Sequence, residues 1–525
     1  MSTNHHHSCC TCHGCRPFTL PQFQAVNRRR FLYHVGAFAA GGLAMSALDV
    51  AAAEADSGPP RHPRYCKPLR VQPVLTYETP QRKEHTSWRN WGGIQSENDA
   101  ARERTHIESE LTALKAQAEV PLEFLPIISA KSGDEAAARL ERTEFDTLLL
   151  YAAGGWGLEK LLRKEHFNLM FLRHDPGPVY LWYEIVHPRL LRKTVDEYGP
   201  LEIDVHDVVV DKNEELLWRL RTHAALKNTL GKRIVCIGGP AGWGEGGHRA
   251  PAIARETWKL ELVDYPYPEL EKRLKAAFQD TALLRRSETA AGRLLREPRL
   301  SLQTARPFLN NAFVLTEVFK DILDEAGTDA ITVNQCMGTI MGMSRTTACM
   351  PLSLLNDEAY LAFCESDFVV IPSGILLHYI SSRPVFLNDP TFPHDGIVTL
   401  AHCTAPRKMD GHRPERTKIF THFESDYGAA PKVEMKVGQL TTTLVPDFGC
   451  KQWLGFAGTI VGNPFLDICR SQVDVRVHGD ANALLEQMKG FHWMLCYGDY
   501  LKECSYALKK LGVEFVNVST LPKAT

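Results

Sequence analysis

The sequence has almost no net charge, because its 60 lysines and arginines nearly balance its 62 aspartates and glutamates, for a formal charge of -2. Its basic residues are scattered along the chain, and aromatic residues are not interleaved with them. Proteins that bind nucleic acid concentrate positive charge on one surface. The composition therefore argues against a nucleic-acid partner.

Long apolar runs are also missing. Beyond the N-terminal region no stretch approaches the ~18 apolar residues that a membrane-spanning helix needs. The N-terminal region itself has three arginines at 28–30, an apolar Gly/Ala-rich stretch over 35–53 and a small-x-small site at 53–55. This order is typical of a twin-arginine export signal. We expect residues 1–55 to direct export to the periplasm or another extracytoplasmic space, and the mature chain to have no stable membrane insertion.

Motifs for common cofactors are absent too. The glycine-rich loop at 238–244, GGPAGWG, has neither the lysine of a phosphate loop nor the G-x-G-x-x-G of a dinucleotide site. Residues 9–13 match the C-x-x-C-H haem pattern, but they precede the export signal, so we exclude haem there. The ten cysteines after the signal form no C-x-x-C pair, and most lie in apolar contexts. We expect buried thiols.

At 525 residues the chain has room for about three domains of ~150 residues. After a Pro-rich linker at 56–68, strands and helices alternate over 69–205 and again over 206–380, and near-continuous apolar runs such as FDTLLLYAA are typical of strands in a parallel sheet. Short β runs split by turn residues fill most of 381–525. The predicted fold class is α/β, with two flavodoxin-like parallel-sheet domains followed by a β-rich, antiparallel barrel-like C-terminal domain. Local patterns predict a helix over 97–119, a strand over 120–128, helix from 280 to 325, and a short strand that carries Glu365.

Two acids and two histidines could form a site for a hard cation. Glu365 and Asp389 each lie at the edge of an apolar run, His402 ends a strand-like segment, and His492 lies far downstream. Carboxylates with imidazoles suit Mn²⁺ or Mg²⁺ and can move protons, as aldose–ketose isomerisation requires. The residue types alone leave other readings open: a helix cap for Glu365, a turn for Asp389 and a core histidine for His492.

The segment also resembles the L-fucose isomerase and L-arabinose isomerase superfamily. The matching features are an E-x-D at 365–367, a helix with L-L-H, a PVFL-x-D, a His-Cys and a late His…YGD, and the two acids are 24 positions apart (389 - 365). The resemblance implies that Glu365 and Asp389 are metal ligands and proton-transfer groups and that His492 is a metal ligand. His402 would match a metal-binding histidine of the arabinose branch. It further implies a homo-oligomer, trimer or hexamer. Phe491 stands where the fucose enzymes have asparagine.

We therefore predict a divalent-metal-dependent aldose–ketose isomerase that acts on a monosaccharide through an enediol, with Mn²⁺ or another divalent cation such as Mg²⁺. Candidate substrate-binding residues are Trp88 and Trp91 in a Gly-terminated loop, Arg345, and Ser425 in a turn. The alternative is an exported carbohydrate-binding protein on the same scaffold, without turnover. A third possibility is metal-dependent hydrolysis or a lyase-type reaction at the same site.

Overall fold

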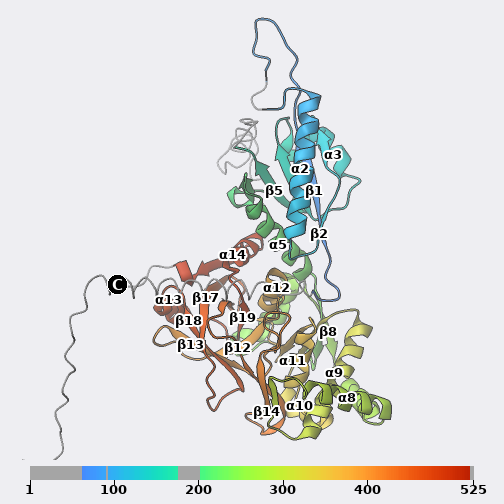
Figure 1. Ribbon diagram of the computed structural model, residues 1–525, viewed down its shortest axis with the longest axis vertical. Coiled ribbons are helices and arrows are strands. Elements are labelled where there is room, and N and C mark those ends of the chain that lie inside the picture. Colours follow the sequence, from blue (N-terminus) through green and yellow to red (C-terminus); the bar gives the residue numbers. More distant parts are fainter. Residues whose placement is uncertain (1–61, 90–92, 175–201, 521–525) are drawn as a thin grey trace, which may run out of the picture. The chain divides into compact units, whose positions relative to one another are not determined.

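The computed structural model describes residues 62–89, 93–174 and 202–520 (Figure 1). The predicted export signal, the haem-like leader, most of the linker and Trp91 lie outside the described residues. Within the described ranges, no helix combines the length and the apolar character needed to cross a membrane.

The first sheet has six parallel strands in the order β2-β1-β4-β5-β6, with β3 also pairing with β1. Every residue of β4 is buried, as expected for a strand covered on both faces. The predicted strand over 120–128 is instead two short strands separated by a segment that contains Pro126, which has no N–H to donate. The strands are β1 Leu69–Thr76, β2 Leu122–Phe124, β3 Ile128–Ala130, β4 Thr147–Ala152, β5 Phe167–Leu172 and β6 Val208–Val210, and the helices of this region are α2 Glu97–Gln117, α3 Gly133–Leu140 and α5 Asn213–Thr229.

The second sheet has four parallel strands in the order β11-β10-β7-β8. The chain runs outward from β7 to β8, returns, and then runs from β10 to β11 on the other side. The order of the strands therefore reverses between β7 and β10, and α/β proteins bind ligands at the carboxyl ends of the strands at such a point. The strands are β7 Arg233–Ile237, β8 Glu261–Tyr265, β10 Ala330–Val333 and β11 Leu361–Cys364, and the helices are α6 Ala250–Glu256, α7 Tyr267–Ala277, α8 Thr281–Leu294, α9 Arg306–Ala326, α10 Cys336–Ser344, α11 Cys349–Asp357 and α12 Ile371–Ser381.

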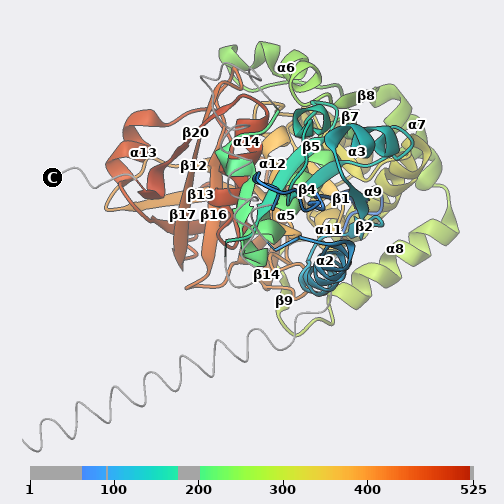
Figure 2. The same ribbon diagram turned by 90° about the horizontal axis from the view of Figure 1, so that it is seen from above.

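Six antiparallel strands form a closed barrel near the C-terminus, in the order β16-β19-β12-β13-β18-β17, and pairing between β16 and β17 closes the ring (Figure 2). The expectation of an antiparallel, barrel-like C-terminal region is confirmed. Strand β20 adds to β17 in parallel. The elements are β12 Phe386–Pro390, β13 Ile397–His402, β16 Leu440–Val445, β17 Gln452–Gly462, β18 Ser471–Val477, α13 Ala481–Gln487, β19 Trp493–Tyr497, α14 Leu501–Lys510 and β20 Glu514–Asn517.

A three-stranded sheet joins the middle of the chain to the C-terminal region, in the order β15-β14-β9. Its strands are β9 Leu300–Leu302, β14 Arg416–His422 and β15 Tyr427–Glu434. The helical region predicted from 280 to 325 holds two helices, α8 and α9, and the prediction fails between them, where β9 forms. The pairing of β9 with β14 bridges more than a hundred residues, and local helical periodicity carries no sign of it.

A buried ion pair ties α11 to the segment after β13. The side chains of Arg407 and Asp357 are 4% and 3% exposed, and Nε lies 2.7 Å from Oδ2. The backbone N–H of Arg407 also donates to Asp357, at 2.8 Å. Burial raises the pKa of Asp357, although the guanidinium opposes the shift.

Removing this carboxylate takes away the buried partner of the guanidinium and leaves it with Glu297, a more exposed carboxylate at 2.8 Å. We expect Asp357→Ala to lower the free energy of unfolding by about 3–5 kcal/mol, measured by denaturant titration. The control is Glu325→Ala, which breaks an exposed pair with Arg273 and should cost about 1 kcal/mol or less. Equal losses in the two variants would contradict the prediction.

Candidate metal centre

Four segments bring the predicted acids and histidines together. Glu365 directly follows β11 at the carboxyl edge of the second sheet, while Asp389 belongs to β12, His402 ends β13 and His492 directly precedes β19. Because β12 pairs with both β13 and β19, the three barrel residues emerge at neighbouring positions. The centre therefore lies where one end of the barrel meets the second sheet.

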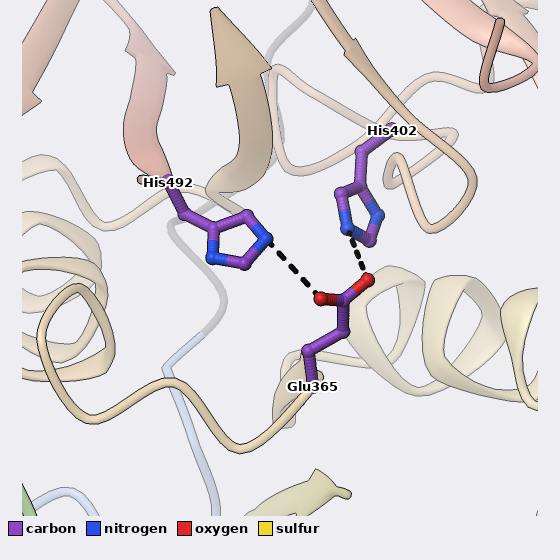
Figure 3. A group of neighbouring side chains, drawn as sticks. All are labelled: Glu365, His402 and His492. Carbon is purple, nitrogen blue, oxygen red and sulfur yellow. Dashed lines mark ion pairs between the residues drawn. The ribbon is translucent and has the colours of Figure 1, made fainter. Parts of the chain in front are cut away.

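The side chains converge on the carboxylate of Glu365. His402 Nε2 lies 3.5 Å from Oε1, and His492 Nε2 lies 3.4 Å from Oε2 (Figure 3). His492 Nε2 is also 3.2 Å from Asp389 Oδ1. One ligand atom from each of Glu365, His402 and His492 lies within 4.8 Å of the others, and these three form the one candidate metal-binding group that the described residues contain.

The polar atoms that face this centre are buried but lack hydrogen bonds. Glu365 Oε2, Asp389 Oδ1, His402 Nε2 and His492 Nε2 have no hydrogen-bond partner among the described residues. Buried polar atoms left without a partner destabilise a fold, so a group of them pointing at one spot calls for an explanation. Ligand atoms bound at about 2.1 Å to one cation lie about 3 Å or more apart. The carboxylate–imidazole separations here are 3.2–3.5 Å. The residues fit a divalent cation with oxygen and nitrogen ligands.

Asp367 holds His492 in the orientation that such a cation needs. Its Oδ2 lies 2.8 Å from His492 Nδ1, and both side chains are fully buried. The other oxygen, Oδ1, accepts the backbone N–H groups of Trp243 and Val369 at 3.2 and 3.1 Å. A carboxylate at Nδ1 keeps the proton there and leaves the lone pair of Nε2 facing the centre.

His402 is oriented in a similar way by a neutral partner. Its Nδ1 lies 3.0 Å from Thr404 Oγ1. For Nε2 to bind a cation, Nδ1–H must donate to this hydroxyl oxygen. Both imidazoles therefore have an outer contact that is compatible with metal binding.

The pKa shifts of the two histidines and of Glu365 are those of a centre that favours positive charge. Burial lowers the pKa of His492, but Asp367, Glu365 and Asp389 outweigh it and raise the pKa to about 10. Burial likewise opposes charge on His402, and the contact with Glu365 raises its pKa. Burial raises the pKa of Glu365, but the two imidazoles prevail and hold it below its usual range, whereas burial dominates at Asp389 and raises its pKa. A divalent cation would take the place of the protons that these imidazoles hold.

The backbone at Glu365 adopts an uncommon conformation. Glu365 and Ser366 have φ values of 63° and 48°, in the left-handed region that non-glycine residues seldom enter. The expected strand over Glu365 therefore ends one residue earlier, at Cys364. Two hydrogen bonds of Ser366 hold this left-handed turn: its N–H donates to Thr332 Oγ1, and its carbonyl accepts the N–H of Ala241. Strained backbone of this kind gathers at functional sites, and here it turns the carboxylate toward the barrel.

A cavity of about 540 Å³ opens beside the centre, with Glu365 in its wall. The rest of the wall comes from the loop after β7 and the segment after β10, namely Ala241, Gly242, Trp243, Gly244, Asn334, Gln335, Cys336, Met337, Gly338 and Thr339. These segments flank the reversal of strand order described above. No lysine or arginine is among the described residues that line the cavity.

Two exposed aromatic rings pack against His492. Trp243 and Phe491 are 43% and 44% exposed and stack in parallel, with centroids 4.6 Å apart and planes 8° apart. Each ring meets the His492 imidazole edge to face. The aromatic pair thus covers one side of His492 and leaves apolar surface facing solvent.

The predicted substrate-binding residues lie in several places. Trp88 precedes α2, and the guanidinium of Arg89 lies 5.2 Å above its ring. Arg345 is exposed at the end of α10, over the ring of Phe278 at 4.6 Å. Ser425 lies in the β14–β15 turn, with Oγ 3.1 Å from Nδ1 of His422. Burial lowers the pKa of His422, and the charges of His402 and Glu365 also act on it, so this turn lies within electrostatic reach of the centre.

Sequence reasoning assigned no role to Asp367, Trp243 or Thr404. The sequence signal for Asp367 is its place two residues after Glu365, in the E-x-D pattern. Trp243 lies in the glycine-rich loop at 238–244, which matches neither a phosphate loop nor a dinucleotide site and so gave no signal for this residue. No protein-family model matches the chain, and no curated protein is significantly similar to it.

Proposed function

We propose that the protein is a divalent-metal-dependent aldose–ketose isomerase that acts on a monosaccharide. The observation that carries the proposal is the convergence of Glu365, His402 and His492 on one spot, where Oε2 of the carboxylate and both Nε2 atoms are buried without a hydrogen-bond partner among the described residues. Asp389 supplies a second carboxylate beside the same imidazole. Two carboxylates at a cation site are what proton transfer between C1 and C2 of an open-chain sugar requires.

Each residue has a defined part in the proposed reaction. Glu365, His402 and His492 would hold the cation, with Mn²⁺ as the first candidate for this donor set. When bound, the cation would polarise the carbonyl and hydroxyl oxygens of the sugar. Asp389 contacts His492 but is not one of the three residues that would hold the cation, so its carboxylate would be free to move a proton. We therefore assign to Asp389 the transfer of the C2 proton to C1 through an enediol. To Glu365 we assign the transfer of the hydroxyl proton from O2 to O1.

The cavity supports a neutral substrate. Asn334, Gln335 and Thr339 offer hydrogen-bonding groups for hydroxyls, and Trp243 with Met337 offers apolar surface for the C–H faces of a sugar. A phosphorylated sugar would need a basic partner, and the described lining has none.

The strand orders support the family resemblance at the level of architecture. Numbered along the chain, the second sheet runs 2-1-3-4. The first sheet runs 2-1-3-4-5 when β2 and β3, which pair with successive parts of β1, are counted as one interrupted strand, and this is the order of flavodoxin-like folds. We propose that both regions are flavodoxin-like. Export by the twin-arginine route and assembly into a trimer or hexamer remain proposals that rest on the sequence.

A panel of neutral aldoses tests the proposed activity. We expect at least one aldose to give its ketose when Mn²⁺ is present, and little product after chelation. In D₂O the ketose should carry deuterium at C1, because the enediol exchanges its proton with solvent. His402→Ala should lose the activity. The control is His394→Ala, which should keep it, because His394 is an exposed histidine whose Nδ1 contacts the carbonyl oxygen of Phe392. Sugar binding without ketose would favour a carbohydrate-binding protein instead.

A further inference from the structure

Cys336, in the wall of the cavity, lies beside a second cysteine, Cys364. Cys336 is the first residue of α10 and is partly exposed, and Cys364 ends β11 with 3% exposure. Their Sγ atoms are 4.0 Å apart, and both thiols are free. Cys364 directly precedes Glu365 in the chain, so one cysteine of the pair is the neighbour of a residue of the candidate metal centre.

Strand pairing explains how the two thiols meet. Strands β10 and β11 are parallel neighbours in which Val333 pairs with Cys364. Two residues after Val333 the chain turns at Gln335, which has a φ of 49°, and α10 begins at the next residue, Cys336. The turn brings Cys336 back over the carboxyl end of β11. The contact is therefore set by the sheet edge rather than by a passing side-chain conformation.

The pair is close enough to cross-link after a small movement. A disulfide joins its sulfur atoms at about 2.05 Å, so the two atoms must approach by about 2 Å. The first turn of α10 has room for this, since Met337 and Gly338 are exposed and a Cβ at Gly338 would meet no atom within 4 Å. Cys364, in contrast, is held within the sheet.

We propose that Cys336 and Cys364 form a thiol modification site, which reacts with a low-molecular-weight disulfide that enters the cavity and closes into an intramolecular disulfide. The Cys336 thiolate attacks one sulfur of the small disulfide, forms a mixed disulfide and releases one small thiolate. The Cys364 sulfur then attacks Cys336 Sγ, loses its proton to solvent and expels the second small thiolate. The two cysteines are oxidised by two electrons, and the small disulfide is reduced to two thiols.

Closing the disulfide should also act on the metal centre. The approach of the sulfur atoms pulls on Cys364, and the next residue, Glu365, contacts both imidazoles in its left-handed conformation. A shift of the carboxylate weakens the cation site, so the oxidised protein should bind Mn²⁺ at least about tenfold more weakly. This consequence rests on the proposed metal site, whereas the cross-link itself does not.

The experiment treats the full chain with oxidised glutathione and maps disulfides by peptide mass spectrometry, with Mn²⁺ affinity measured before and after. We expect a 336–364 linkage, weaker Mn²⁺ binding, and recovery of both on addition of dithiothreitol. Cys336→Ser and Cys336→Ala should show neither change, and Cys66→Ser, at a partly buried cysteine elsewhere, should behave as the wild type.

The outcomes separate this inference from the proposed activity. Glutathione that stays on Cys336, or thiols that do not react, would overturn the modification site whatever the protein catalyses. A linkage that leaves Mn²⁺ affinity unchanged would overturn the coupling to Glu365. If the linkage forms in a protein that isomerises no sugar, the proposed function fails and the thiol site stands.

Discussion

Glu365→Gln is expected to lower isomerase turnover by about 10²–10⁴-fold and to weaken Mn²⁺ binding by more than about tenfold. Glu365 contacts both imidazoles of the centre. Its replacement by a neutral amide removes a negative charge from the cation site and a proton-transfer group from the reaction. Turnover is measured on the aldose that the panel identifies, and Mn²⁺ affinity is measured by calorimetry or by electron paramagnetic resonance.

Asp389→Asn provides the informative comparison. Its carboxylate contacts His492 but lies outside the group formed by Glu365, His402 and His492, so we expect a similar loss of turnover but a smaller loss of Mn²⁺ affinity than in Glu365→Gln. Glu424→Gln is the matched control, because Glu424 is an exposed acid whose charge acts on Asp389 from outside the group. Full turnover in Glu365→Gln would remove this residue from the reaction. Equal losses of Mn²⁺ affinity in both variants would make Asp389 a full ligand.

Much of the architecture could be predicted because apolar runs and turn residues in the local sequence indicate the strands. The apolar runs at β4 and β7 match strands buried on both faces, and short β segments after residue 381 match the barrel. The errors occur where a tertiary contact overrides the local pattern. Strand β9 interrupts a helical region because it pairs with β14, and Pro126 interrupts a strand that composition alone would continue.

The residues that could bind the cation were predictable from the sequence, but the hydrogen bond to Asp367 that orients His492 was not. Glu365, Asp389, His402 and His492 were named from chemistry and from a resemblance, and the fold brings them together. The contact between Asp367 and His492 joins residues 125 positions apart. No periodicity or spacing encodes such a contact, because the meeting of β11 with the barrel creates it.

Asp367→Asn is expected to weaken Mn²⁺ binding by about 10–100-fold, although Asp367 itself is not a ligand in the proposed site. The reason lies in the direction of its hydrogen bonds. Oδ1 accepts two backbone N–H groups, from Trp243 and Val369, so an asparagine there must keep its carbonyl oxygen on that side. Its NH₂ group then faces His492 Nδ1, which can only accept. The proton moves to Nε2, the atom that should face the cation, and the imidazole presents the wrong tautomer.

A positioning role predicts a rescue that a purely structural role does not. Because Glu365 and Asp389 are intact in Asp367→Asn, saturating Mn²⁺ should restore much of its turnover, whereas Glu365→Gln should stay inactive at the same concentration. The control is Asp395→Asn, at an exposed turn residue with a φ of 51° that asparagine tolerates, and it should match the wild type in both affinity and turnover. Thermal unfolding of the metal-free proteins separates loss of stability from loss of affinity. If Asp367→Asn binds Mn²⁺ as tightly as the wild type, the tautomer of His492 does not control the site, and the role assigned to Asp367 is wrong.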